Sequence, residues 1–407
     1  MQNILIIGAG DFQLPLVQRA SLSYNVLLAA PVISDAFKPY ITDSLLIDVR
    51  DEEAILAYAR EHSICGVITD QTDIAVRSVA YVAENLGLPG IGSEAGRLFT
   101  DKSLMRDRMA ELGIKLLPHR TVSSMEEGLN FYREIGGNVI IKPLDTQGSR
   151  GVQICRSESE LRSKYAEAAR WSSGHQVLIE RYATGREFVV EGIAVDYEFQ
   201  NACIGDTLYF DLPDAFAAKS RIFPTTADDE LRQRVLDLNT KIITGFGLKQ
   251  GLTHSEFIMD GDDIYLIETA ARGGGVFISS DLIHYSCGLD TEGFLLDIAT
   301  GRQKGLPEIK PQQCVCGYLA FYIPTGRVIS VSGVSEVQNL PYVHRNQLDK
   351  IRVGLENKAG HSDKTSRIAL IVSAPDRETF DQRAALIRET LQVDTDTGYG
   401  IKPLIWE

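Results

Sequence analysis

Residues 253–275 read THSEFIMDGDDIYLIETAARGGG, and this stretch decides the fold prediction. Two apolar runs flank the turn sequence Asp260-Gly261-Asp262-Asp263, which predicts a β-hairpin. The hairpin would place the carboxylates of Glu256 and Glu268 side by side, where like charges are costly unless a cation bridges them. Magnesium suits such a bridge because it is a hard ion that takes carboxylate and phosphate oxygens. A proton shared between the two carboxylates is the alternative.

The residues after the second predicted strand are suited to a phosphate group. Arg272 is followed by Gly273-Gly274-Gly275, so a guanidinium lies next to an open backbone. A guanidinium binds phosphate through paired, charge-assisted hydrogen bonds. The hairpin and its arginine therefore predict a site for a phosphorylated ligand and a metal ion.

Lys142 ends an apolar run further upstream, and a lysine in that position must find an anionic partner or leave the core. The loop Asp145–Val152 follows directly. Its backbone N–H groups at Gly148, Ser149 and Gly151 could donate to polyphosphate oxygens. An ordinary β-hairpin turn fits the same loop equally well.

Glu180 stands at the end of the apolar strand predicted for Val177–Glu180, and Glu187 follows seven residues later. A nucleotide needs backbone groups along the adenine edge and an acceptor for its ribose hydroxyls, and this segment offers both. Surface carboxylates are the alternative for both residues. Lys102, which follows Asp101 at the start of a predicted helix, fits a surface charge as well as a functional one.

The glycines Gly8-Ala9-Gly10 follow the first predicted strand and are similar to the start of a dinucleotide-binding turn. The third glycine of that fingerprint is absent, because Gln13 takes its place, and no acidic residue stands out about 20 positions further on. A tight turn in a Rossmann-like sheet is therefore preferred over a nicotinamide-dependent dehydrogenase.

The order of strands and helices predicts an α/β fold followed by a smaller α+β unit. Residues 1–95 alternate short apolar runs with helical patterns, which indicates βαβ units on a parallel sheet. Prolines at positions 307 and 311 then break the pattern before the last unit. Strands are expected over 4–7, 26–30, 66–69, 139–142, 177–180, 188–195, 253–259, 264–268, 317–322, 328–334 and 368–374, and helices over 54–62, 74–86, 228–246 and 377–391.

The bulk composition narrows the class of protein. A length of 407 residues suggests two to four packed units, and 44% hydrophobic with 24% charged residues is ordinary for a soluble protein. No run approaches the ~18 apolar residues of a membrane-spanning helix, and the start lacks a secretory signal, so a cytoplasmic location without membrane contact is expected. The net charge of -14 disfavours a nucleic-acid partner. Six cysteines without a CxxC pair indicate reduced thiols.

Taken in order, these features resemble the ATP-grasp superfamily. The resemblance covers the middle of the chain, and the flanking units look like those of its carboxylase-like and L-amino-acid-ligase-like branches. It implies a Rossmann-like domain over 1–95, an ATP-grasp domain over 96–305 with a lid-like subdomain over about 115–187, and a C-terminal α+β lobe over 306–407. The residues that carry it are Lys102, Lys142 with its glycine loop, Glu180, Glu187, Glu256, Glu268 and Arg272.

The resemblance also implies a cofactor and roles for individual residues. ATP would bind with one or two magnesium ions, or with manganese, held by Glu256 and Glu268. Many members carry Asn two residues after the second metal-binding Glu, where this chain has Ala270, so the number of ions is left open. Arg272 would steady an acyl phosphate, and Lys142 would share the catalytic role. Lys102, Lys142, Gly148, Ser149 and Gly151 would contact the phosphates, Glu180 with the backbone of Arg181 and Ala183 the adenine, and Glu187 the ribose.

The implied activity is that of an ATP-dependent carboxylate–amine ligase, which forms an amide or peptide bond through an acyl phosphate and releases ADP and phosphate. The partners would be a small carboxylate and an amine, amino acids included, and a homodimer is a common arrangement among similar proteins. The alternatives are a bicarbonate-activating carboxylase of the biotin-carboxylase or purine-biosynthesis type and a non-catalytic ATP-binding regulator. Candidate substrate-facing residues are Lys219, Arg221, His254 and Gly274.

Overall fold

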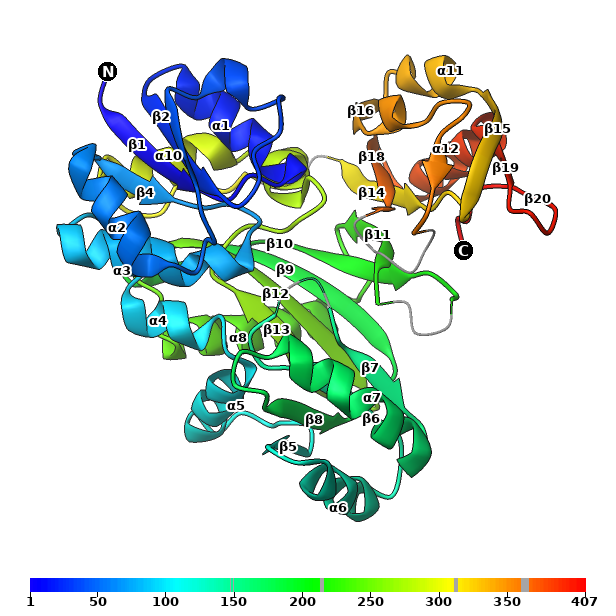
Figure 1. Cartoon of the computed structure of the whole chain (residues 1–407), viewed down its shortest axis with the longest axis horizontal. Helices are drawn as coiled ribbons and strands as arrows, with labels where there is room; N and C mark the ends of the chain where they lie inside the picture. Colours follow the sequence, from blue (N-terminus) through cyan, green and yellow to red (C-terminus); the bar gives the residue numbers. More distant parts are fainter. Residues whose placement is uncertain (147, 149, 213–215, 311–313, 360–365) are drawn as a thin grey trace. The chain divides into compact units, whose positions relative to one another are not determined.

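The computed structural model describes residues 1–146, 148, 150–212, 216–310, 314–359 and 366–407 (Figure 1). The chain divides into two compact units. The first comprises Met1–Ala202, Ala227–Ser280 and Leu289–Ile309, and the second comprises Cys203–Thr226, Asp281–Gly288 and Lys310–Glu407. The division into three domains that the sequence suggests stays a prediction.

The first unit begins with a four-stranded parallel sheet. Its elements are β1 (Asn3–Ile7), β2 (Asn25–Ala30), β3 (Asp43–Leu46) and β4 (Gly66–Ile68), with helices α1 (Leu14–Ser21), α2 (Glu52–Glu61) and α3 (Val76–Leu86). The strand order is β3-β2-β1-β4, and the apolar residues of β1 and β2 are buried, as expected of strands covered on both faces. Gly8 turns the chain after β1 with φ 105°, and the buried Gln13 side chain donates to the carbonyl of Ile7 at 2.8 Å. This arrangement is the tight turn of a Rossmann-like sheet.

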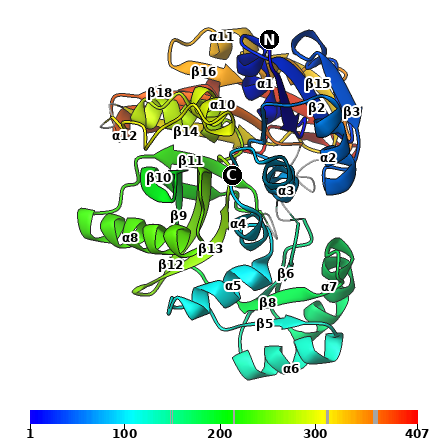
Figure 2. The ribbon, with the colours of Figure 1, turned by 90° about the vertical axis from the view of Figure 1, so that its left-hand side faces the viewer.

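A four-stranded antiparallel sheet follows in the same unit. Its elements are β5 (His119–Val122), β6 (Val139–Pro143), β7 (Gln153–Cys155) and β8 (Val177–Arg181), with helices α6 (Met125–Ile135) and α7 (Glu158–Trp171). The strand order is β5-β8-β6-β7. Both helices pack on one face, where Leu129 and Phe131 of α6 meet Leu161 and Tyr165 of α7 in a shared core (Figure 2). The other face is left to residues such as Lys142 and Glu180.

A third set of strands completes the first unit. Its elements are β9 (Arg186–Val195), β10 (Glu198–Tyr209), β12 (Gly251–Asp260) and β13 (Asp263–Ala270), with helices α4 (Ser93–Leu98), α5 (Lys102–Glu111), α8 (Asp229–Gly245) and α10 (Thr291–Ala299). The first unit includes β10 only as far as Ala202. The order is β13-β12-β9-β10, and α8 lies along these strands in both views (Figures 1 and 2). The predicted hairpin is present as β12 and β13, joined through Gly261 at φ 63°.

The second unit is an α+β structure around its own core. Its further elements are β11 (Ala218–Phe223), β14 (Val315–Phe321), β15 (Gly326–Ser332), β16 (Val343–Asn346), β17 (Glu356–Asn357), β18 (Ile368–Ala374), β19 (Gln392–Asp396) and β20 (Ile401–Lys402), with helices α9 (Ile283–Cys287), α11 (Val334–Gln338) and α12 (Arg377–Thr390). Within this unit the strand order is β10-β11-β14-β18-β16, where β10 contributes its residues from Cys203 on, and a second sheet has the order β17-β15-β19-β20. Phe321, Leu370 and Phe380 are fully buried in this core.

The structure confirms the α/β and α+β fold class, and every strand and helix expected from the sequence is present. The strands β3, β5, β10, β11, β16, β17, β19 and β20 were not expected from the sequence. Within the described ranges, no helix has both the length and the apolar character needed to cross a bilayer.

Candidate nucleotide and metal site

Three charged side chains form a buried ion-pair cluster between α5, β6 and β8. Lys142 Nζ lies 2.6 Å from Glu180 Oε2, and Arg106 Nε lies 2.7 Å from Glu180 Oε1. Arg106 also donates to the carbonyl of Ile267 at 2.8 Å. Burial raises the pKa of Glu180, but the charges of Arg106 and Lys142 outweigh burial and hold that pKa well below its usual range. Lys142 therefore has the anionic partner that its position required.

This cluster bears on the predicted adenine contacts. Both oxygens of Glu180 are engaged by Lys142 and Arg106, so its carboxylate has a structural role in addition to any contact with a nucleotide. The backbone N–H of Arg181 donates to the carbonyl of Pro118 at 2.9 Å. The adenine contacts of Glu180, Arg181 and Ala183 stay predictions, as does the ribose contact of Glu187 in β9.

Lys102 is the first residue of helix α5, and its side chain connects this helix to the hairpin and to the glycine loop. Asp101 caps α5, since its carboxylate accepts from the backbone N–H groups of Ser103 and Leu104 at 2.9 and 3.1 Å. The Lys102 side chain, which is 7% exposed, places Nζ 2.7 Å from Glu268 Oε1 and 3.1 Å from the carbonyl of Thr146. A buried ammonium is thus held between a predicted metal ligand and the predicted phosphate loop.

The glycine loop is described in part. Gly148 and Gly151 have φ of 68° and 72°, conformations that favour glycine. A Cβ on Gly151 would stand 2.7 Å from the indole of Trp171, so a larger residue does not fit there. Ser149 lies outside the described residues. The predicted phosphate contacts of these three residues stay predictions.

The two predicted metal ligands face each other on the hairpin. Glu256 and Glu268 are direct partners in the β12–β13 register, next to an irregularity between Glu256 and Phe257. Their side chains are partly exposed. No cluster of three or more His, Cys, Asp or Glu side chains suited to a metal ion occurs in the part of the chain that the structure describes. Magnesium usually takes one or two carboxylates and completes its shell with phosphates and water, so this pair fits an ion that arrives with a nucleotide.

A buried histidine lies between two glutamates beside this pair. His254 Nδ1 contacts Glu191 Oε1, and His254 Nε2 is 3.2 Å from Glu256 Oε1. Glu191 is fully buried in β9, and its second oxygen accepts from the backbone N–H of Gly274 at 3.1 Å. The candidate substrate residues His254 and Gly274 are therefore joined through Glu191 and lie next to the metal-ligand pair.

The Arg272 side chain is held by Asp73, which follows the last strand of the N-terminal sheet. Its Nε and Nη2 donate to the two carboxylate oxygens of Asp73 at 2.6 and 2.9 Å, and Nη1 donates to the carbonyl of Gly273 at 2.9 Å. Burial lowers the pKa of Arg272, but its attraction to Asp73 outweighs burial and keeps the pKa above its ordinary value. The guanidinium is thus permanently charged and fixed in orientation.

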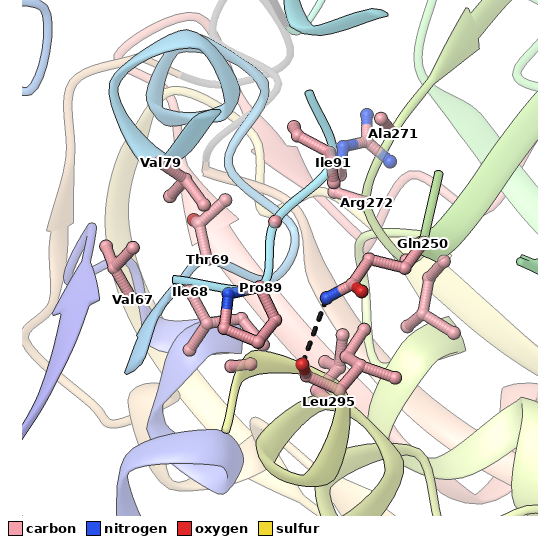
Figure 3. A pocket seen from close by; sticks show the side chains of 15 residues that line it. Val67, Ile68, Thr69, Val79, Pro89, Ile91, Gln250, Ala271, Arg272 and Leu295 are labelled. Atoms are coloured by element: carbon pink, nitrogen blue, oxygen red, sulfur yellow. Dashed lines mark hydrogen bonds between the residues drawn. The ribbon is translucent and has the colours of Figure 1, made fainter. Parts of the chain in front are cut away.

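A small cavity lies behind Arg272. It has a volume of about 30 Å³, and Thr69, Ala271, Arg272 and Gln250 are among the residues that line it (Figure 3). Gln250 Nε2 donates to the carbonyl of Ile298 at 2.9 Å. A volume of this size suits a few water molecules at most and is far too small for a nucleotide.

The remaining candidates lie elsewhere. Lys219 and Arg221 belong to β11 in the second unit, whereas the other described site residues belong to the first. Lys219 Nζ forms an ion pair with Glu407 of that second unit. Their predicted contact with substrate stays a prediction.

Arg106, Asp73 and Glu191 were not predicted from the sequence, although each leaves a signal there. Arg106 is four residues after Lys102, so both project from one face of α5. Asp73 follows the carboxyl end of a parallel strand, where ligand-binding residues gather in open α/β sheets. Glu191 is a lone charge in the apolar run FVVEGIAV, which marks a buried carboxylate that needs partners.

A model of the family described as carbamoyl-phosphate synthase L chain, ATP binding domain, matches residues 101–304, which is half of the chain. The chain belongs to the ATP-grasp superfamily. This membership confirms the family and fold inferred from the ordered lysines, glutamates and Arg272, and it agrees with the prediction of an ATP-dependent ligase. The structure of an L-amino acid ligase from Bacillus licheniformis has the same fold, with a TM-score of 0.81 at 20% identity over 97% of this chain and 99% of that one.

Two relatives of this ATP-grasp protein are similar in sequence. The uncharacterized protein y4rH of Sinorhizobium fredii is 25% identical over 79% of this chain and 69% of its own length. The alanine–anticapsin ligase of Bacillus subtilis is 26% identical over 63% of this chain. The chain aligns with 59% of the length of that ligase, so the similarity concerns part of each protein.

Proposed function

We propose that this ATP-grasp protein is an ATP- and magnesium-dependent ligase that joins a carboxylate to an amine through an acyl phosphate, with release of ADP and phosphate. The observation that carries the proposal is the facing pair Glu256 and Glu268, with the Lys102 ammonium 2.7 Å from Glu268 and the fixed Arg272 guanidinium four residues further along the chain. Binding of a nucleotide alone does not require paired carboxylates beside the Lys102 and Arg272 cations.

The roles of the side chains follow from charge and position. Phosphoryl transfer is accelerated mainly by positioning and by charge neutralisation. Lys102 and Lys142 would offset charge on the ATP phosphates, while Arg272, held by Asp73, would offset charge on the acyl phosphate. When bound, magnesium at Glu256 and Glu268 would supply further neutralisation of the phosphate oxygens. The loop Asp145–Val152 would keep water from the acyl phosphate during its lifetime.

A bicarbonate-activating carboxylase is the second candidate, because it would use the same phosphate and metal residues. The relatives whose printed names are ligases of amino acids support the carboxylate–amine reaction instead. The predicted homodimer and the cytoplasmic location stay predictions.

The experiment that tests the proposal is the release of ADP and phosphate from magnesium ATP in the presence of defined substrate pools. The pools are L-amino acids, other small carboxylates with amines, and bicarbonate with aminoimidazole ribonucleotide. Turnover that requires both a carboxylate and an amine supports the ligase. Turnover that requires bicarbonate transfers the protein to the carboxylase branch. Tight binding of magnesium ATP without turnover in any pool contradicts the ligase and favours the regulator.

A further inference from the structure

A buried carboxyl group with an unused oxygen follows strand β4. Asp70 is 1% exposed, and its Oδ2 accepts from Gln71 Nε2 at 3.2 Å. Asp70 Oδ1, Gln71 Oε1 and Ser279 Oγ are buried atoms without a hydrogen-bond partner among the described residues. We call these three atoms the acceptor cluster. Buried polar atoms without partners are rare and costly, so such a cluster points to a group that is supplied from outside the chain.

Two atoms of the acceptor cluster, from Asp70 and Ser279, lie against the backbone next to Arg272. A Cβ on Gly273 would stand 2.7 Å from Asp70 Oδ1 and still closer to Ser279 Oγ, so only glycine lets the backbone approach both atoms. Arg272 itself is committed to Asp73 and to the carbonyl of Gly273. The cluster therefore borders the group expected to steady the acyl phosphate, and Arg272 does not satisfy its oxygens.

The backbone around the cluster is strained. Gln71 has φ 59°, and Val276 and Phe277 have φ 57° and 61°, which is uncommon for residues with a side chain and rarest for a β-branched valine. The ring of Phe277 packs edge to face on Phe12 with 4.9 Å between centroids. Strain of this kind gathers at ligand-binding segments, where surrounding contacts hold it in place.

The chemistry of the cluster selects a cation with several N–H donors. Burial raises the pKa of Asp70 to about 6, while polar contacts with Ser279, Gln71 and the Gly273 backbone and the charge of Arg272 act in the opposite direction. Asp70 Oδ1 and Ser279 Oγ nevertheless lack a partner with full hydrogen-bond geometry among the described residues. At neutral pH the carboxylate is then mostly ionised in a buried setting, which favours a positively charged partner. A carboxylate, an amide carbonyl and a hydroxyl together match the three N–H groups of a primary ammonium.

We propose that Asp70, Gln71 and Ser279 bind the ammonium group of an amino acid whose carboxylate is activated next to Arg272. The inference rests on the proposed ligase function and names the substrate class of that site. The bound ammonium cannot be the attacking nucleophile, because a protonated amine has no free electron pair. It belongs instead to the carboxylate substrate, whose charged groups must be close together to reach Asp70 and Arg272 at once.

The test compares amino acids with 2-hydroxy acids that lack only the ammonium. The probes are pooled L-amino acids and the matched 2-hydroxy acids, with L-alanine against L-lactate and L-phenylalanine against L-phenyllactate as individual pairs. Binding is measured by calorimetry with magnesium and a non-hydrolysable ATP analogue, and turnover by ADP release. The full-length wild type, Asp70→Asn, Ser279→Ala and the control Asp35→Asn are compared. Asp35 is an exposed surface carboxylate paired with Lys38.

The wild type and Asp35→Asn are expected to prefer an amino acid over its hydroxy analogue by about tenfold or more, as a charged hydrogen bond implies. Asp70→Asn should bring this ratio close to one without a change in the affinity for the ATP analogue. Ser279→Ala should lower the ratio several-fold and serves as the deciding variant where Asp70→Asn does not fold.

The outcomes separate the two proposals. Retention of the full preference in Asp70→Asn, or in Ser279→Ala if the first variant is unfolded, overturns the ammonium site. So does a wild type that shows no ammonium-dependent binding or turnover with any probe. Ammonium-dependent binding that is lost in Asp70→Asn, in a wild type without turnover, would support the site and contradict the ligase.

Discussion

The Asp73 carboxylate and the Arg272 guanidinium form a two-point ion pair, with oxygens 2.6 Å from Nε and 2.9 Å from Nη2. Asp73 begins the 3-10 helix Asp73–Ala75 after strand β4, whereas Arg272 follows strand β13 at the end of the hairpin. The pair therefore fixes the guanidinium of the hairpin from the N-terminal sheet. Its parallel contacts define the plane of the guanidinium, which a single contact would not do.

Asp73→Asn is expected to lower kcat about tenfold, because the neutral amide weakens the pair and loosens the orientation of Arg272. Arg272→Lys should lower kcat further, since an ammonium cannot make the two-point contact. Asp48→Asn is the matched control, because Asp48 makes the same two-point contact with Arg50 on the exposed surface. Steady-state kinetics with magnesium ATP measure the effect, and an equal response of the Asp48 and Asp73 variants would sink the positioning role.

The hairpin could be predicted from the sequence because its signals are local. Apolar runs and a two-residue turn predict the hairpin and its register next to the turn. That register alone would set Glu268 opposite Ser255. The irregularity between Glu256 and Phe257 shifts the pairing by one residue and brings Glu256 opposite Glu268, and the sequence carries no clear signal for it. Lys142 was also predictable as a buried charge, since it ends an apolar strand, but the sequence does not say which anion it meets.

The partners of these residues could not be predicted, because they come from distant parts of the chain. Asp73 is 199 residues from Arg272, and Glu191 is 63 residues from His254. Such pairs depend on which strands become neighbours, and the pairing of β9 with β12 is a property of the whole sheet. A lone charge in an apolar run of the sequence indicates that a buried partner is needed, but it does not identify that partner.

Glu180→Gln is expected to lower the free energy of unfolding by about 3–5 kcal/mol, because it leaves the Arg106 and Lys142 charges buried without their anion. Lys142→Ala should be milder in this respect, since Arg106 keeps both contacts with Glu180, but it should raise the ATP concentration required for turnover. Urea unfolding measures the first effect and the KM for ATP the second.

The control for this cluster is Glu134→Gln, which breaks an exposed two-point pair with Arg120. Exposed pairs contribute little, so its unfolding midpoint should stay near that of the wild type. If Glu134→Gln and Glu180→Gln lowered the free energy of unfolding by similar amounts, burial would not be the reason for the contribution of the Glu180 cluster to stability.

Glu268→Gln is expected to abolish turnover and to raise the magnesium concentration needed for nucleotide binding, because one of the two facing carboxylates loses its charge. The same change breaks the ion pair with Lys102. Lys102→Met separates the two effects, since it should weaken ATP binding without changing the magnesium dependence. Asp262→Asn in the loop of the hairpin is the control. Full activity of Glu268→Gln across a magnesium titration would contradict the metal assignment.

Asp70→Asn should change stability in a pH-dependent way. Burial raises the pKa of Asp70 from 3.8 to about 6, so between these values the folded protein binds more protons than the unfolded one. The free energy of unfolding of the wild type therefore loses a contribution as the pH rises through this window. The variant has no such titrating group. The free energy of unfolding of Asp70→Asn minus that of the wild type should therefore grow by up to about 3 kcal/mol between about pH 4 and pH 6 and then stay constant. Urea unfolding across this range measures it, and a pH-independent difference would refute a buried, ionising Asp70.

Gly274→Ala is expected to disturb the contact between Glu191 and His254. A Cβ at this position would stand 2.7 Å from Glu191 Oε1 and 2.8 Å from the Cβ of Ile278, which is closer than real contacts allow. Gly274 also donates its N–H to Glu191 Oε2 at 3.1 Å. The added Cβ would therefore displace the Glu191 carboxylate and break this hydrogen bond. We expect turnover to fall about tenfold or more, together with a lower melting temperature, as for overpacking of a buried site.

Gly275→Ala provides the matched control one residue further along. An added Cβ there meets nothing within 4 Å, so activity and melting temperature should stay near those of the wild type. The comparison holds the substitution and the local sequence constant and changes only what the new methyl group touches. Equal losses in both variants would mean that the glycine segment is needed for its flexibility, whereas a loss confined to Gly274→Ala ties function to the position of the Glu191 carboxylate.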